Sequence, residues 1–305
     1  MMITNWGLFA GLIALVLFLD LGVFRRHAHT ISIREALVWS AIWISLSLAF
    51  NTWIYFELGR PAAVAFLTGY IVEKSLSVDN LFVFIVIFTF FAVPGKLQHR
   101  VLFWGIIGAL ITRGILIALG ITLIQRFHWL TYVFGAFLIF TGIKATFSKE
   151  KRMEPERNPI IRLLNRILPV SKYYDEGKFF VKEGRHILAT PLFVVLLVIE
   201  ITDVLFALDS IPAILAITLD PFIVYSSNVF AILGLRALFF ALAGVMQLFE
   251  YLQYGVSMVL VVVGVKMIVG STFHIPDYVM LMAVGGILLS SIVVSLVKAK
   301  LHPES

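Results

Sequence analysis

The sequence contains no cysteine and few charged residues. Its 305 residues are 14% charged and 60% hydrophobic, whereas globular domains are about 25% charged and about 45–50% apolar. The absence of cysteine excludes disulfide frameworks, thiolate metal sites, iron–sulfur clusters and cysteine nucleophiles among the side chains of this chain. The shortage of charge and the mean hydropathy of +0.99 indicate a chain that is solvated mainly by lipid. A soluble globular protein is therefore excluded.

Signatures of nucleotide hydrolysis and of nucleic-acid binding are also lacking. No G-x-x-x-x-G-K-[ST] phosphate loop occurs, and no soluble segment is large enough to hydrolyse a nucleotide, so direct coupling to ATP is not expected. The formal net charge is +6, but ten of the 24 Lys and Arg residues lie in the single segment 148–188. One basic loop is typical of the cytoplasmic side of a membrane protein. We therefore expect no enzyme, no cofactor and no nucleic-acid partner.

Nine apolar stretches are long enough to cross a bilayer as helices, because a hydrocarbon core of about 30 Å requires roughly 20 apolar residues. The stretches are 6–24, 34–56, 62–92, 100–124, 129–147, 189–219, 226–249, 255–271 and 277–297. Arg25 and Arg26 follow the first stretch, so the positive-inside rule places the N-terminus outside and, after nine crossings, the C-terminus inside. The sequence thus predicts an all-α polytopic membrane protein.

Three short sequence matches recur in the same order in two parts of the chain. They are Glu73-x5-Asp79-Asn80 with Asp203-x5-Asp209-Ser210, Gly108-Ala-Leu-Ile-Thr-Arg113 with Ala231-Ile-Leu-Gly-Leu-Arg236, and Thr141-Gly-Ile-Lys144 with Val263-Gly-Val-Lys266. The stretch that carries the first match runs inward in one part and outward in the other. The pattern predicts a 3+3 inverted repeat, which is typical of secondary transporters and places a substrate site near the membrane midplane.

The repeat divides the chain into five parts. Two N-terminal membrane helices (1–61) precede the first three-helix repeat (62–147), a basic cytoplasmic connector (148–188), the second three-helix repeat (189–271), and a last membrane helix with a cytoplasmic tail (272–305). Within the connector, Asn158-Pro159 and the helical spacing that follows predict an interfacial helix. The segment from Lys178 to Thr190 is predicted to form a small hairpin.

Charged residues lie inside the apolar stretches, where each costs at least about 2.5–3.5 kcal/mol on insertion scales. The acids are Asp20, Glu73, Asp79, Glu200, Asp203 and Asp209, and the bases are Lys74, Arg113, Lys144, Arg236 and Lys266. We expect Arg113 and Arg236 to pair with the acids, and Lys144 and Lys266 to extend toward the span ends. A purely structural network of ion pairs is the alternative to a cation site.

The spacing of the acids limits how they can act together. On a continuous helix, residues six apart lie about 120° apart in azimuth and roughly 9 Å apart along the axis, so Glu73 and Asp79 cannot share one ion. Either the helix is broken or the two carboxylates have different roles. The length of the stretches 62–92 and 189–219, and Pro212 in the second, favour interrupted or kinked helices whose free carbonyls line a cavity.

Carboxylates with the neighbouring Asn80 and Ser210 offer oxygen ligands only. Such a set suits Mn²⁺, Ca²⁺ or Mg²⁺ and disfavours Cu⁺ and Zn²⁺, which prefer sulfur or imidazole. Glu200 and Asp203 are three residues apart and share one helix face. Because a bound divalent cation displaces protons from closely spaced carboxylates, one such site can exchange protons for metal.

These residues resemble the TerC family of integral membrane proteins, most closely its Alx-like branch. The matching strings are Phe18-Leu-Asp20-Leu-Gly-Val-Phe24, Gly69-Tyr-Ile-Val-Glu73-Lys74-Ser-Leu-Ser-Val-Asp79-Asn80, Glu200-Ile-Thr-Asp203-Val-Leu-Phe-Ala-Leu-Asp209-Ser210-Ile-Pro212 and Asn228-Val-Phe-Ala-Ile-Leu-Gly-Leu-Arg236. The resemblance covers nearly the whole chain and implies a member of the lysine-exporter-like superfamily that exports Mn²⁺ from the bacterial cytoplasm. It places eight residues at or near the cation path: Asp20, Glu73, Asp79, Asn80, Glu200, Asp203, Asp209 and Ser210.

The sequence therefore predicts a secondary transporter of the bacterial inner membrane that exports Mn²⁺, with protons as the exchanged ion. One alternative changes the ion to Ca²⁺ or another divalent cation. The other changes the class, to a membrane scaffold or an insertion or metalation factor without transport, because relatives of the family have been tied to such roles. The sequence leaves the oligomeric state open.

Overall fold

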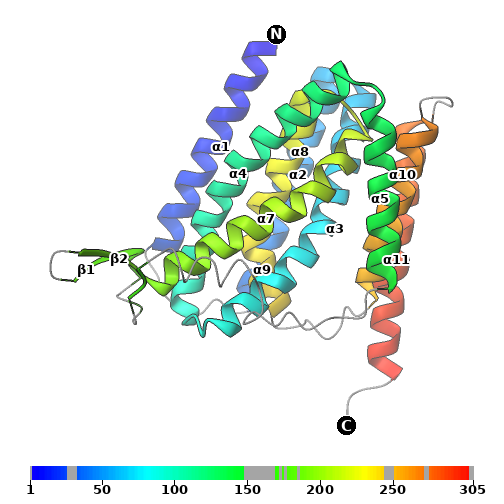
Figure 1. Cartoon of the computed structure of the whole chain (residues 1–305). Helices are drawn as coiled ribbons and strands as arrows, with labels where there is room; N and C mark the ends of the chain where they lie inside the picture. Colours follow the sequence, from blue (N-terminus) through cyan, green and yellow to red (C-terminus); the bar gives the residue numbers. More distant parts are fainter. Residues whose placement is uncertain are drawn as a thin grey trace.

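The computed structural model of the chain describes residues 2–25, 33–147, 169–171, 174, 177–183, 186–243, 251–270 and 275–301. Within these ranges the protein consists of ten helices and one small hairpin (Figure 1). The helices are α1 (Met2–Arg25), α2 (Ile33–Leu58), α3 (Arg60–Phe90), α4 (Gly95–Arg126), α5 (Leu130–Phe147), α7 (Pro191–Leu215), α8 (Pro221–Leu233), α9 (Leu235–Ala243), α10 (Leu252–Val269) and α11 (Asp277–Leu301), and the strands are β1 (Phe180–Glu183) and β2 (His186–Ala189).

The helices coincide with the predicted apolar stretches, and the stretch 226–249 overlaps the α8–α9 pair. By length and composition, α2, α4, α5, α7 and α11 can each cross a membrane, and the bent α8–α9 pair can provide a sixth span. This count covers the described residues alone. The prediction of an all-α membrane protein is confirmed, while the nine crossings and the orientation of the termini stay predictions.

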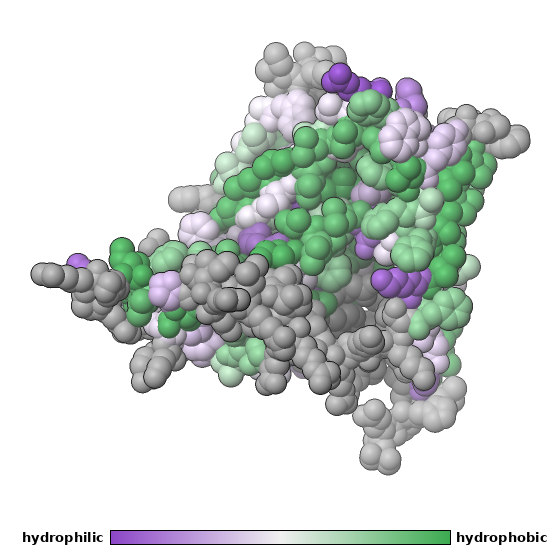
Figure 2. All heavy atoms as spheres, in the orientation of Figure 1, coloured by the Kyte–Doolittle hydropathy of each residue, from purple (hydrophilic) through white to green (hydrophobic). Residues whose placement is uncertain are grey.

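The described surface is strongly apolar. Hydrophobic residues cover most of the helices on the face shown in Figure 2, and side chains as large as Phe56, Phe147 and Leu289 are 80%, 81% and 65% exposed. Soluble monomers rarely leave extended apolar patches uncovered. The exposed side chains are therefore accounted for by contact with lipid.

Helices α3 and α7 are continuous, so the expected interruptions of 62–92 and 189–219 are wrong. Pro212 lies in the last turn of α7, which ends at Leu215, so the helix stays continuous up to its end although the carbonyl of Leu208, one turn earlier, loses its usual donor. The break occurs instead at Gly234, where α8 and α9 meet at 40°. No proline marks the position of this break, because the mostly apolar sequence around Gly234 contains no proline.

The centre of the bundle is formed by α3, α4, α7 and α8. Helix α3 packs against α7 and α8, and α4 packs against the same two helices. Gly69 of α3 lies against Ile214 of α7 and Ser227 of α8, with no room for a side chain. This close approach places the charged residues of α3, α4 and α7 near one another.

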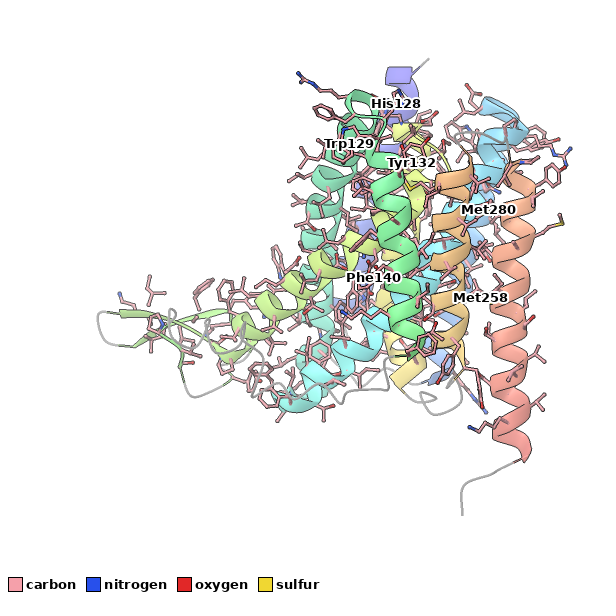
Figure 3. All side chains as sticks on the ribbon, turned by 45° about the vertical axis from the view of Figure 1, so that its right-hand side comes forward. His128, Trp129, Tyr132, Phe140, Met258 and Met280 are labelled. Carbon is pink, nitrogen blue, oxygen red and sulfur yellow. The ribbon has the colours of Figure 1, made fainter. Side chains whose placement is uncertain are left out.

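Helices α5 and α10 form a second tightly packed group (Figures 1 and 3). A Cβ atom added at Gly135 would lie 2.9 Å from the carbonyl oxygen of Gly264, and one at Gly142 would lie 2.6 Å from that of Ser257. The contacts advance along α5 as they move backward along α10, so the two helices are antiparallel. Helix α11 packs against α10 and α3.

The small hairpin predicted between Lys178 and Thr190 is confirmed. Strands β1 and β2 are antiparallel, with Phe180 opposite Ala189 and Lys182 opposite Ile187. The hydroxyl of Thr190 donates to the carbonyl of Lys178 at 2.7 Å and joins the hairpin to the start of α7. The predicted interfacial helix lies outside the described residues.

The orientation can be tested with single cysteines, since the chain has none of its own. Lys178→Cys, beside the hairpin, is expected to resist a membrane-impermeant maleimide in intact cells and to react after permeabilisation. His128→Cys, in the α4–α5 turn at the end of the bundle opposite the hairpin (Figure 3), is expected to react in intact cells. Labelling of Lys178→Cys from outside would reverse the predicted orientation.

Candidate functional site

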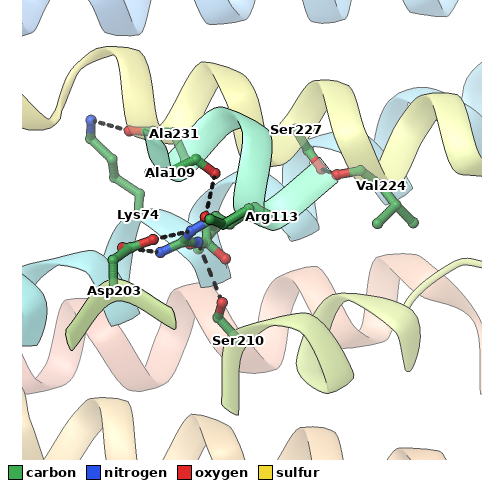
Figure 4. Close-up of polar contacts among 10 residues, drawn as sticks. Lys74, Ala109, Arg113, Asp203, Ser210, Val224, Ser227 and Ala231 are labelled. Carbon is green, nitrogen blue, oxygen red and sulfur yellow. Dashed lines mark hydrogen bonds and ion pairs between the residues drawn. The ribbon is translucent and has the colours of Figure 1, made fainter. Parts of the chain in front are cut away.

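The guanidinium of Arg113 in α4 joins two carboxylates that come from different helices (Figure 4). Its Nη2 and Nε donate to the two carboxylate oxygens of Asp203 in α7, at 2.8 and 3.1 Å. Its Nη1 forms an ion pair with Glu73 of α3 and lies 3.4 Å from the hydroxyl of Ser210. Arg113 therefore ties α3, α4 and α7 together at one point.

This cluster is buried. Arg113 and Glu73 are each 1% exposed and Asp203 is 4% exposed, and ionised groups at such depth are tolerated only when they are paired. With both acids ionised, two negative charges face one positive charge. The second oxygen of Glu73, Oε2, is buried without a hydrogen-bond partner among the described residues. The cluster thus retains an unused carboxylate oxygen.

Glu200 lies beside the same cluster. Its carboxylate fills the space next to Gly108 of α4, where any side chain would collide with it. Glu200 and Asp203 therefore both face α4, in agreement with their shared helix face. Gly108 could have been noticed from the sequence, because it opens the second repeat match, where its counterpart is Ala231.

Asp209 faces a different neighbour. It lies beside Thr141 of α5, and its Oδ1 is buried without a hydrogen-bond partner among the described residues. Asp203 instead faces α4, so the six-residue spacing on continuous α7 separates the two acids as helix geometry requires. The second reading of the spacing, in which the two carboxylates have different roles, fits α7. Thr141 opens the third repeat match, where its counterpart is the apolar Val263.

Three further predicted site residues are placed less fully. Asn80 is buried in α3, at 2% exposure. The side chains of Asp20 and Asp79 lie outside the described part of the chain, so their positions in the site stay predictions. Among the described residues, no group of three or more His, Asp or Glu side chains could hold a metal ion. The ligand set proposed from the sequence likewise stays a prediction.

Two further basic residues, Lys74 and Arg236, lie in helices that pack around the cluster. Lys74 of α3 donates from Nζ to the carbonyl oxygen of Ala231 in α8, at 3.1 Å and next to the break at Gly234. Arg236 of α9 is buried, and it lines a small, mostly apolar cavity together with Asp203. The cavity reaches the cluster from the side of α9.

The two lysines at the ends of the third repeat helices differ. Lys144 of α5 is exposed, and its ammonium lies 5.9 Å from the ring centre of Phe140 (labelled in Figure 3). Lys266 of α10 is buried, at 8% exposure. Burial inside the bundle does not decide whether either lysine extends toward the end of its span, so that expectation stays a prediction.

The fold and the buried cluster define a polytopic α-helical membrane protein with paired charges in its core. The chain belongs to the TerC family, because the model of the "Integral membrane protein TerC family" matches residues 58–302. The family predicted from the sequence is thereby confirmed.

Relatives match over nearly their whole length. The chain is 51% identical over 302 residues to an uncharacterized membrane protein of Myxococcus xanthus, covering 98% of this chain and 95% of the relative. It is 46% identical over 299 residues to the protein of Escherichia coli K12 named "Putative membrane-bound redox modulator Alx", covering 95% and 93%. No solved structure matches the chain.

Proposed function

We propose that this protein is a secondary transporter that exports Mn²⁺ from the bacterial cytoplasm in exchange for protons. One observation carries the proposal: Glu73 and Asp203, which occupy matched positions in the predicted repeat, meet at Arg113 in the buried core. In inverted-repeat transporters the substrate site lies where the two repeats meet. Membership of an integral membrane family and bacterial relatives support a place in the inner membrane.

The helix contacts support the predicted repeat. If α3, α4 and α5 correspond to α7, the α8–α9 pair and α10, then the α3–α8 contact corresponds to the α7–α4 contact, and both occur. Gly142 matches Gly264, and Gly135 precedes Gly142 by as many residues as Ser257 precedes Gly264. Swapping the two repeats therefore turns the contact of Gly142 with Ser257 into the contact of Gly264 with Gly135, and the structure contains both contacts. An inverted repeat of this kind is suited to alternating access.

The chemistry of the site favours a hard cation. Its candidate ligands supply only oxygen, and the chain has no thiolate to select a softer metal. The name of the Escherichia coli relative refers to redox modulation. Because this chain has no cysteine, its own side chains cannot carry out thiol–disulfide exchange. Transport of a metal ion accounts for the charged core without requiring that chemistry.

A structural role for the charges is the competing proposal, and a specific observation favours it. Arg113 joins three helices through paired carboxylates, as an ion-pair network in a scaffold or an insertion or metalation factor also would. A scaffold requires no metal flux. An exporter of Ca²⁺ or another divalent cation requires flux with a different selectivity.

Flux into proteoliposomes separates the three proposals. The purified full chain is expected to move Mn²⁺ with a saturable rate, and an excess of Ca²⁺, Mg²⁺, Zn²⁺ or Fe²⁺ is tested as a competitor. Because the ligands are oxygens, Zn²⁺ is expected to compete less well than Mn²⁺ itself. Preferred transport of Ca²⁺ would change the ion, and no flux of any of the five cations would favour the scaffold.

A further inference from the structure

Arg113 lies where a transported cation would have to bind. Its guanidinium is between Glu73 and Asp203, one acid from each predicted repeat, and uses both oxygens of Asp203. We propose that Arg113 is a built-in cation that fills this site in the empty transporter, and that a divalent cation bridges both acids only after the guanidinium withdraws from Asp203. This inference rests on the proposed function and concerns the regulation of the same site.

The geometry gives the exchange an order. Each oxygen of Asp203 already accepts a hydrogen bond from Arg113, and the guanidinium occupies the side of the carboxylate that a chelated cation would take, so Asp203 is less available to a cation than an oxygen without a partner. Glu73 gives one oxygen to Arg113, and its Oε2 is buried without a partner among the described residues. An incoming cation therefore binds first to Glu73 Oε2 and then replaces Arg113 at Asp203.

The two competing cations differ in charge and in hydration. A divalent cation neutralises both carboxylates, whereas Arg113 neutralises one of them. The guanidinium is tethered and weakly hydrated, so it returns to Asp203 without the cost of dehydrating a free ion. While it is bound to Asp203, its Nη1 lies 3.4 Å from the hydroxyl of Ser210, which offers a neighbouring acceptor when the guanidinium withdraws. Arg113 thus competes with the transported ion without being lost from the site.

The role of Arg113 differs between the loaded and the empty transporter. Two bare carboxylates in the core would oppose a conformational change, because unpaired buried charges are costly. When no metal is bound, Arg113 pairs with both carboxylates, neutralises one of the two charges and leaves the other for a proton, so the empty transporter can return to the cytoplasmic side. Net export requires this return, whereas exchange of Mn²⁺ for Mn²⁺ does not.

Binding of Mn²⁺ to the purified full chain tests the competition directly. Electron paramagnetic resonance reports the free Mn²⁺ that remains at each protein concentration. Arg113→Gln is expected to raise the affinity for Mn²⁺ by about tenfold, in the range of typical coupling between two ligands of one site. Arg126→Gln is the matched control, since it removes an arginine from the exposed end of the same helix and is expected to leave the affinity unchanged.

Two flux measurements test the return step. In proteoliposomes, Arg113→Gln is expected to keep most of the exchange of a radioactive Mn²⁺ tracer when Mn²⁺ is on both sides, and to lose most net export when it is on one side only. A residue that merely holds the acids in place would lose both together. Equal or weaker Mn²⁺ binding in Arg113→Gln, or parallel loss of exchange and net export, overturns the proposal.

Arg113→Lys keeps the test decisive if the glutamine variant does not fold. Lysine keeps the charge but lacks the planar fork that contacts both oxygens of Asp203, so the affinity for Mn²⁺ is expected to rise by about threefold. Affinity equal to or below that of the wild-type protein overturns the proposal. A wild-type protein that neither binds nor transports Mn²⁺ is a different result, because it rejects the proposed function and this inference with it.

Discussion

Replacing Asp209 with Asn is expected to abolish Mn²⁺ export from proteoliposomes while the protein still inserts and folds. Its Oδ1 is buried without a partner among the described residues, so the oxygen is available to a cation. Changes to groups that merely orient a metal ligand already cost about 10–100-fold in affinity or activity, so loss of the ligand itself is expected to reduce flux by at least about 100-fold. Initial rates of Mn²⁺ flux measure the effect.

Asp209 gives a cleaner test than the acids of the cluster. Glu73→Gln or Asp203→Asn would leave the buried Arg113 partly unpaired and cost about 3–5 kcal/mol of stability, so lost flux could reflect lost folding. Among the described residues, the named neighbour of the Asp209 carboxylate is the uncharged Thr141, so Asp209→Asn strands no buried cation there. Asp209→Asn is expected to elute from size-exclusion chromatography as a monodisperse peak at the same volume as the wild-type protein.

Asp220→Asn is the matched control for this substitution. Asp220 is exposed and caps the start of α8 by accepting from the backbone N–H of Phe222 at 2.9 Å, a role that asparagine also fills. The rate of Mn²⁺ flux through the Asp220→Asn variant is expected to equal that through the wild-type protein. Asp79→Asn, at the matched position of the other repeat, is expected to behave like Asp209→Asn. Normal Mn²⁺ export by both Asp79→Asn and Asp209→Asn would place the cation path elsewhere.

Much of the fold could be predicted because the membrane imposes a simple length rule. Apolar stretches of the required length mark the helices, and the hairpin after Lys178 follows from a short polar interruption before α7. Local patterns were insufficient for the helix break. Pro212 is a residue that commonly breaks helices, but it lies in the last turn of α7. The actual break between α8 and α9 is at Gly234, where the surrounding sequence remains mostly apolar.

The site was predictable in its residue types but not in its pairing. A charge in an apolar stretch demands a partner, so the importance of Glu73, Asp203 and Arg113 could be inferred from the sequence. Which acid pairs with which arginine depends on the crossing of α3, α4 and α7. Arg113 takes one acid from each repeat, although the repeat itself supplies two arginines. The repeat alone therefore does not fix which arginine Glu73 and Asp203 share, and the packing of the helices decides it.

Transport of Mn²⁺ is expected to drive protons in the opposite direction. The cluster of Glu73, Asp203 and Arg113 has one more acid than base, and Asp209 adds another carboxylate without a partner for its Oδ1 among the described residues. Uncompensated negative charge is costly in a buried site, so the empty site takes up protons and a bound divalent cation releases them. Proteoliposomes that enclose a pH-sensitive dye report this exchange.

An imposed Mn²⁺ gradient should therefore drive protons in the direction opposite to Mn²⁺, and the enclosed dye reports the resulting pH change. An imposed pH gradient should in turn drive Mn²⁺ against its own concentration gradient. Asp209→Asn should remove both effects together, whereas Asp220→Asn should retain both. If Mn²⁺ moves at full rate without any pH change and ignores an imposed pH gradient, the protein is a uniporter. The carboxylates would then act as ligands only, and the excess negative charge of the site would have to be balanced by another cation.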